Sequence, residues 1–110
     1  MKILEINKKK YPVSFGKGFL LRLERDYKID IKDIESLFEK KPFETIPNVI
    51  MAALDEGARI EKKEHKLYIY DIMDAWDFDE NLIQNFFELF NESQSKEGEK
   101  KIIEADIKSS

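Results

Sequence analysis

The spacing of apolar residues changes near the N-terminus, from two short strand-like runs to a helical repeat. Residues 2–6 and 11–15 are rich in β-branched and aromatic side chains and are separated by Asn7 and three lysines. Such a pair of runs predicts a β-hairpin, which must pack on another element because an isolated ribbon of this length is unstable. Gly16 and Gly18 then mark the change of period.

From Phe19 onward, apolar residues recur at the spacing of amphipathic helices. The first helix starts at Phe19, and a second is predicted over residues 31–40 with Asp30 as its N-terminal cap. A third covers about residues 44–56, with Gly57 as its C-terminal cap. The stripes of these helices are Phe19, Leu20, Leu23 and Tyr27, then Ile31, Ile34, Leu37 and Phe38, then Ile46, Val49, Ile50, Ala53 and Leu54.

Two further helices are predicted after a highly charged connection, residues 58–66, which either extends the third helix or forms a loop. The fourth helix runs from Leu67 to Trp76, and the fifth begins after Asp79, which is placed to cap it. The apolar residues of the fifth helix cover an arc of roughly 160°, wider than a surface helix needs. They are Leu82, Ile83, Phe86, Phe87, Leu89 and Phe90.

These elements predict a mainly α fold of four to five helices with an N-terminal β-hairpin. The 110 residues suit one domain, which we place at residues 1–95, followed by a flexible charged tail at 96–110. A hydrophobic fraction of 42% beside 38% charged residues is enough for a packed core and a charged surface.

Charge is distributed unevenly along the chain. The net charge is −4 overall, but residues 1–30 carry +4, while residues 67–95 carry seven acids and no lysine or arginine. This acidic stretch repels nucleic acid and anionic membranes, and therefore favours a protein partner. The N-terminus has no apolar run of secretory length and no window is long enough to span a membrane, so we expect a soluble protein made in the cytoplasm.

The chain offers little for catalysis or for metal binding. It has no cysteine and one histidine, which excludes thiolate chemistry and any site with two histidines. His65 lies in a run of charged residues and is expected to be solvated. Asp77, Asp79, Asn81 and Glu88 match part of a calcium loop, but Leu82 stands where the sharp turn needs glycine, so helix capping explains these acids better.

Two lysine-containing segments also have simpler explanations than ligand binding. Gly16-Lys17-Gly18 lacks the spacing of a phosphate-binding loop and is read as a turn between strand and helix. Lys8-Lys9-Lys10 is read as a solvated hairpin tip. We therefore expect no catalytic, cofactor-binding or metal-binding residues.

The unusual feature is a surplus of aromatic residues in the acidic half of the chain. Most belong in the core, but the wide apolar arc of the fifth helix indicates a surface for a partner or for self-association. The residues that we predict to form this surface are Trp76, Phe86, Phe87 and Phe90.

The order of these elements resembles a known family, the tail assembly chaperones of long-tailed bacteriophages and prophages of Gram-positive hosts. The resemblance covers about residues 3–95 and rests on soft patterns of apolar spacing. The segments that carry it are Tyr11-Pro12-Val13-Ser14-Phe15-Gly16, Phe19-Leu20-Leu21-Arg22-Leu23-Glu24, Pro42-Phe43 to Ala52-Ala53-Leu54, Asp71 to Trp76, and Leu82 to Phe90.

The resemblance implies a non-enzymatic protein of the host cytoplasm that is absent from the mature virion. Proteins of this family bind the tape measure protein, keep it soluble and help to recruit tail tube protein during virion assembly. Many also exist in a longer, frameshifted form. An alternative function is a small regulatory protein, an antitoxin or transcription-associated factor, whose basic N-terminal part contacts nucleic acid. The acidic composition argues against that alternative.

Overall fold

The N-terminal hairpin is closed by a two-residue turn. In the computed structural model, which describes residues 2–94, β1 (Lys2–Ile6) pairs antiparallel with β2 (Lys9–Val13), and Ile6 lies opposite Lys9. Asn7 and Lys8 both have positive φ, as the tight hairpin turns that match strand twist require. The expected second strand at 11–15 therefore begins two residues earlier, because the short turn brings Lys9 and Lys10 into the ladder.

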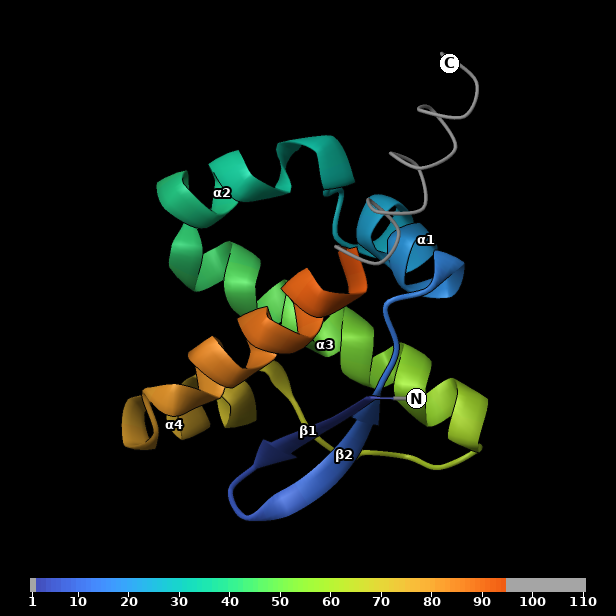
Figure 1. The fold of residues 1–110 in the computed structure, drawn as a ribbon, viewed down its shortest axis with the longest axis vertical. Helices are drawn as coiled ribbons and strands as arrows, with labels where there is room; N and C mark the ends of the chain where they lie inside the picture. The colour runs from blue at the N-terminus through green and yellow to red at the C-terminus, as the bar shows by residue number, and fades with distance from the viewer. Residues whose placement is uncertain (1, 95–110) are drawn as a thin grey trace, which may run out of the picture.

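Five α-helices follow within the described residues, so the mainly α fold with an N-terminal hairpin is confirmed (Figure 1). A 3-10 turn, η1 (Ile31–Asp33), precedes the second of them, and the Asp30 carboxylate accepts a hydrogen bond from the Lys32 amide as predicted. The helices are α1 (Lys17–Asp26), α2 (Ile34–Lys40), α3 (Pro42–Glu61), α4 (Ile69–Phe78) and a final helix over residues 81–94.

The longest helix, α3, runs through the middle of the molecule between the hairpin and α2 (Figure 1). Pro42 occupies its first turn, where a missing amide hydrogen costs nothing. The helix continues beyond the predicted end at Gly57 and is capped by Lys62, which has a left-handed φ of 57°. Residues 58–61 thus extend the helix, and residues 62–68 form a connection without helix or strand.

Gly57 has a different function from the predicted cap: it lets the hairpin approach α3. A Cβ atom on Gly57 would lie 2.0 Å from the carbonyl oxygen of Pro12, so no side chain fits there. Beside this contact, the Ser14 amide donates a hydrogen bond to the Ala53 carbonyl at 3.2 Å. The backbone after β2 is therefore fixed directly onto the helix.

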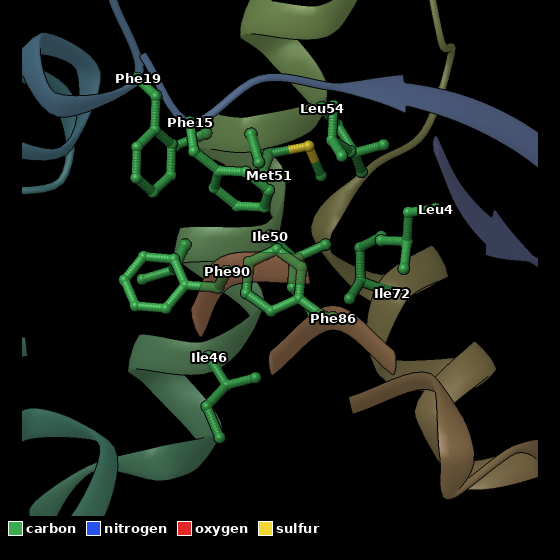
Figure 2. Packing of buried hydrophobic residues seen from close by; sticks show 14 of the residues in the cluster. Leu4, Phe15, Phe19, Ile46, Ile50, Met51, Leu54, Ile72, Phe86 and Phe90 are labelled. Carbon is green, nitrogen blue, oxygen red and sulfur yellow. The ribbon is translucent and has the colours of Figure 1, made fainter. Parts of the chain in front are cut away.

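The core lies where the hairpin, α3 and the final helix meet. Leu4, Ile6 and Val13 supply the inner face of the hairpin and are almost fully buried. Four aromatic rings gather beside the apolar stripe of α3 (Figure 2): Phe15, Phe19, Phe86 and Phe90. Offset and edge-on ring pairs of this kind add stability beyond the area that they bury.

The caps of the later helices agree in part with the sequence. The Asp79 carboxylate accepts a hydrogen bond from the Asn81 amide at 3.0 Å, which confirms its predicted capping role. The fourth helix starts at Ile69, two residues after the predicted start, where the Asp71 carboxylate accepts from the Tyr68 amide at 2.7 Å.

The predicted flexible tail at 96–110 lies outside the described residues. Within residues 2–94, no helix combines the length and hydropathy that a membrane crossing requires.

We predict that Gly57→Ala destabilises the fold, although alanine favours helix. The added methyl group would force the Pro12 carbonyl away from α3, and such overpacking should lower the free energy of unfolding by about 2 kcal/mol. Urea denaturation followed by circular dichroism measures the change. Gly16→Ala is the matched control, since its Cβ would meet nothing closer than Ser14 Oγ at 3.7 Å, and it should change stability by less than about 0.5 kcal/mol. Equal stability of the two variants would contradict this account.

Lys62→Gly should stabilise the protein. Glycine adopts the left-handed cap conformation without the steric cost borne by lysine, and the expected gain is about 0.5–1 kcal/mol. Thermal denaturation of this variant should show a higher melting temperature. Lys63→Gly is the control, because the neighbouring Lys63 has no positive φ and gains nothing from glycine; a similar rise in both variants would refute the capping argument.

Candidate functional site

The four predicted partner-binding residues do not form one surface. Phe86 and Phe90 are 0% and 5% exposed, and both pack against Phe15 with ring centroids 5.7 Å apart. The prediction that they are available to a partner is therefore wrong for this structure. The wide apolar arc of the final helix is covered from several sides, by Phe15 after β2, by Phe19 of α1 and by Phe38 of α2.

Phe87 and Trp76 are half-buried and lie in different environments. The Phe87 ring packs on Phe38 of α2 at 5.1 Å between centroids, whereas the Trp76 ring lies 5.4 Å from that of Phe43 at the start of α3. Of the predicted set, Trp76 thus borders the more open surface.

Large apolar side chains with little cover lie on α4 and at the start of α3. Phe43 is 69% exposed, Tyr70 is 76% exposed and Phe78 is 90% exposed. We call Phe43, Tyr70 and Trp76 the aromatic face; Phe78 is not part of it, because a step of two residues along α4 turns its side chain roughly 160° away from Trp76. It occupies the outer side of α4 and the neighbouring first turn of α3, where the contact between these helices brings Phe43 and Trp76 together. Such exposure of aromatic rings on a small domain is typical of an interaction surface.

A small hollow lies in the aromatic face between α3 and α4. Phe43, Met73 and Trp76 form its apolar wall, and Asp77 and Glu80 form its acidic edge, around a volume of about 200 Å³. Small-molecule pockets usually hold about 300–1,000 Å³, so this hollow suits one side chain of a partner better than a metabolite.

Sequence reasoning missed Phe43 but had a signal for Phe78. Phe43 falls on the same helical stripe as Ile50 and Leu54, which are buried, and it is exposed only because it stands at the very start of α3. Phe78 instead lies off the buried stripe of α4, which contains Ile72 and Ala75. Its spacing from that stripe indicates an outward-facing ring.

Three arginines, Arg22, Arg25 and Arg59, are paired with carboxylates within the protein. The buried carboxylate of Glu56 accepts hydrogen bonds from Arg59 on the same helix and from Arg22 of α1, the latter at 3.3 Å. Arg25 pairs with Asp26 at 2.9 Å. These pairs reduce the positive charge that α1 and α3 present to solvent, which weakens the case for a nucleic-acid surface.

Gly18 makes room for the Glu56 pair. A Cβ atom on Gly18 would lie 1.9 Å from Glu56 Oε2, so the carboxylate passes directly over the start of α1. Hydrogen bonds from Arg59 and Arg22 hold the pKa of Glu56 below its ordinary value, although burial acts in the opposite direction. The carboxylate thus stays charged and ties α1 to α3.

His65 is not solvated, contrary to the sequence-based expectation. Its Nε2 lies 2.6 Å from Asp55 Oδ1, and its Nδ1 accepts a hydrogen bond from the Leu67 amide at 2.9 Å. Because Nδ1 accepts, Nε2 carries the proton that is shared with Asp55. Both ring nitrogens are occupied, so the imidazole fastens the 62–68 connection to α3 and offers no free nitrogen for proton transfer.

His65 borders an open depression of about 740 Å³ between α3 and the 62–68 connection. Its lining is mostly charged, with Arg22, Asp55, Lys63 and Glu64 contributing both signs. Ligand pockets are usually lined by apolar groups with a few convergent polar groups. The charged lining of this depression differs from that pattern. Within the described part of the chain, no three acidic or histidine side chains come close enough together to hold a metal ion.

Comparison with known proteins gave no relative from which a function could be transferred. No protein-family model, curated protein or solved structure matched this chain.

The Glu56 pair predicts a pH-dependent contribution to stability. Because the pKa of Glu56 is lower in the folded state, its ion pairs stabilise the protein above the unfolded-state pKa, and this contribution is lost as the pH falls through the folded-state pKa. Glu56→Gln should therefore lower the unfolding free energy by about 1–3 kcal/mol at pH 7, and by less at pH 3. Urea denaturation at several pH values measures the unfolding free energy of both proteins, and thus the loss at pH 7 and at pH 3.

Asp26→Asn is the control for this experiment, since Asp26 and its partner Arg25 are exposed. Exposed ion pairs contribute little, so this variant should remain close to the wild type at pH 7. If the unfolding free energy of Glu56→Gln stays below that of the wild type by the same amount down to pH 3, packing and not charge accounts for the loss.

Proposed function

We propose that this protein is a phage tail assembly chaperone, which binds the tape measure protein, keeps it soluble and helps to recruit tail tube protein. One observation supports this function above the others: the aromatic face is exposed beside a well-formed apolar core. Exposure of such apolar rings to water is unfavourable, and a partner that covers the rings removes this exposure.

The helical architecture suits a partner that is itself a helix. An amphipathic helix binds by laying its apolar side into a hydrophobic groove, with anchors about one turn apart. The aromatic face offers anchor sites on two neighbouring helices, α3 and α4. The host cytoplasm, where the tape measure protein is made, is the compartment that this function implies.

The acidic surface around the aromatic face supports a protein partner over a nucleic acid. Asp74, Asp77 and Glu80 are exposed around the rings, and residues 67–95 contain no lysine or arginine. Phosphate backbones would be repelled there. The regulatory alternative would need the basic N-terminal part, where Arg22 and Arg25 are already paired with carboxylates.

Coexpression with the tape measure protein of the same phage or prophage tests this proposal. The wild-type chain should raise the soluble yield of the tape measure protein and co-purify with it. Phe43→Ser combined with Tyr70→Ser should abolish both effects, while the circular dichroism spectrum stays helical because both side chains are exposed.

Tyr68→Ser is the matched control, since Tyr68 is equally exposed but borders the depression beside His65. This variant should still raise the soluble yield of the tape measure protein and co-purify with it. Loss of solubilisation in both variants would point to a nonspecific effect, and wild-type chain that neither solubilises nor co-purifies with the tape measure protein would refute the proposal.

A further inference from the structure

We infer that the hollow between Phe43 and Trp76 receives a lysine or arginine side chain of a basic amphipathic helix. The inference deepens the proposed function, because it states which chemistry the partner must present at this surface. It rests on the same aromatic face but makes a separate claim, namely that positive charge on the partner selects it.

The walls of the hollow suit the stem and the head of a basic side chain. The rings of Phe43 and Trp76 lie 5.4 Å apart and are inclined by 37°, so that they form a partly open aromatic corner. A cation held against an aromatic ring face is attracted by the ring quadrupole, most strongly with tryptophan. Met73 adds a flexible apolar wall that adapts to the aliphatic stem.

The edge of the hollow supplies the opposite charge. Asp77 and Glu80 line it and are exposed, and no ion pair within residues 2–94 engages either carboxylate. Asp74 lies one turn before Asp77 and Phe78 on the exposed side of α4. A cation in the hollow would therefore find aromatic and carboxylate groups that currently have no cationic partner.

Neighbouring charges do not already fill this role. Among the described residues of the stretch 67–94 there is no lysine or arginine, and Lys41, next to Phe43 in sequence, lines a different hollow with Tyr27 and Leu37. The nearest cation in sequence thus belongs to another side of α3. An external lysine or arginine is the group that complements the site.

The exposed ring of Tyr70 beyond the hollow indicates that the cation belongs to a helix with an apolar side. Tyr70 lies about two turns before Asp77 on the same side of α4 and is 76% exposed, so an isolated cation in the hollow would leave its ring uncovered. A helix that carries lysine or arginine beside an apolar stripe contacts both regions at once. An acidic helix would not complement the carboxylates of the hollow, and a purely polar helix would not cover the aromatic ring beside it.

Fluorescence of Trp76 provides a direct test, because this is the only tryptophan in the chain. The probe is a tryptophan-free helical peptide with a leucine stripe flanked by lysines, compared with the same peptide carrying glutamate at the lysine positions. Titration of the full-length protein with the lysine peptide should shift the Trp76 emission and saturate, and the glutamate peptide should bind at least about tenfold more weakly.

Substitution of the rim carboxylates separates charge recognition from folding. Asp77→Asn combined with Glu80→Gln should weaken binding of the lysine peptide about tenfold and reduce its dependence on salt. Glu35→Gln combined with Glu39→Gln, which removes two exposed charges from α2, is the matched control and should bind as the wild type does. Circular dichroism of both variants should remain unchanged.

Three outcomes would overturn the inference. Equal binding of the lysine and glutamate peptides would show that apolar contact alone suffices. Equal loss in the α4 and α2 variants would show a general charge effect. A shift of Trp76 emission with protein concentration in the absence of peptide, removed by changing Lys8, Lys9 and Lys10 to glutamate, would show that the hairpin of a second copy fills the hollow.

This test and that of the proposed function fail separately. If the lysine peptide binds selectively but the tape measure protein is not solubilised, the partner is a different basic helix and the chaperone function is wrong. If the tape measure protein is solubilised equally by wild type and by the Asp77→Asn, Glu80→Gln variant, the chaperone function stands and the inferred charge recognition is wrong.

Discussion

The close approach of the hairpin to α3 is the contact on which the other elements depend. Gly57 has no side chain to hold the Pro12 carbonyl away, and the Ser14 amide bonds to the Ala53 carbonyl in the middle of the helix. This fixed crossing directs Phe15 into the space between α1 and the final helix, where it meets Phe19, Phe86 and Phe90. A two-stranded ribbon that would be unstable alone is thereby stabilised, and it completes the core in return.

The same packing explains why the aromatic residues are divided between core and surface. The Phe86 and Phe90 rings of the final helix are buried in the core around Phe15, so they are not accessible to a partner in this structure. The rings on α4 and at the start of α3 lie beyond the edge of that core, and they remain open to solvent. Asp77 and Glu80 border this open region, and no ion pair within residues 2–94 engages them, so it has the chemical character expected of a site for a basic amphipathic segment.

Polar contacts fix the positions of the supporting elements. Glu56 joins α3 to α1 through Arg22 and is also bonded by Arg59 of its own helix, and the pair formed by His65 and Asp55 holds the returning connection on α3. In each case the groups satisfy one another: the carboxylate is held charged by its guanidinium partners, and both nitrogens of the imidazole are engaged. Titratable residues are therefore used here to place helices, which leaves the aromatic face as the part of the described surface best suited to recognition.

The sequence by itself determined the kinds of element and their order, because strand and helix periods, proline positions and caps such as Asp30 and Asp79 are local properties. It also determined the separation of charge, since the absence of cations from residues 67–95 needs no coordinates. Only the tertiary structure decided that Gly57 is a contact residue within a helix, that His65 reaches Asp55, and that Phe86 and Phe90 are core while Phe43 is exposed. The physical reason is that burial depends on which elements cover a helical stripe, and that covering is supplied by residues distant in the chain.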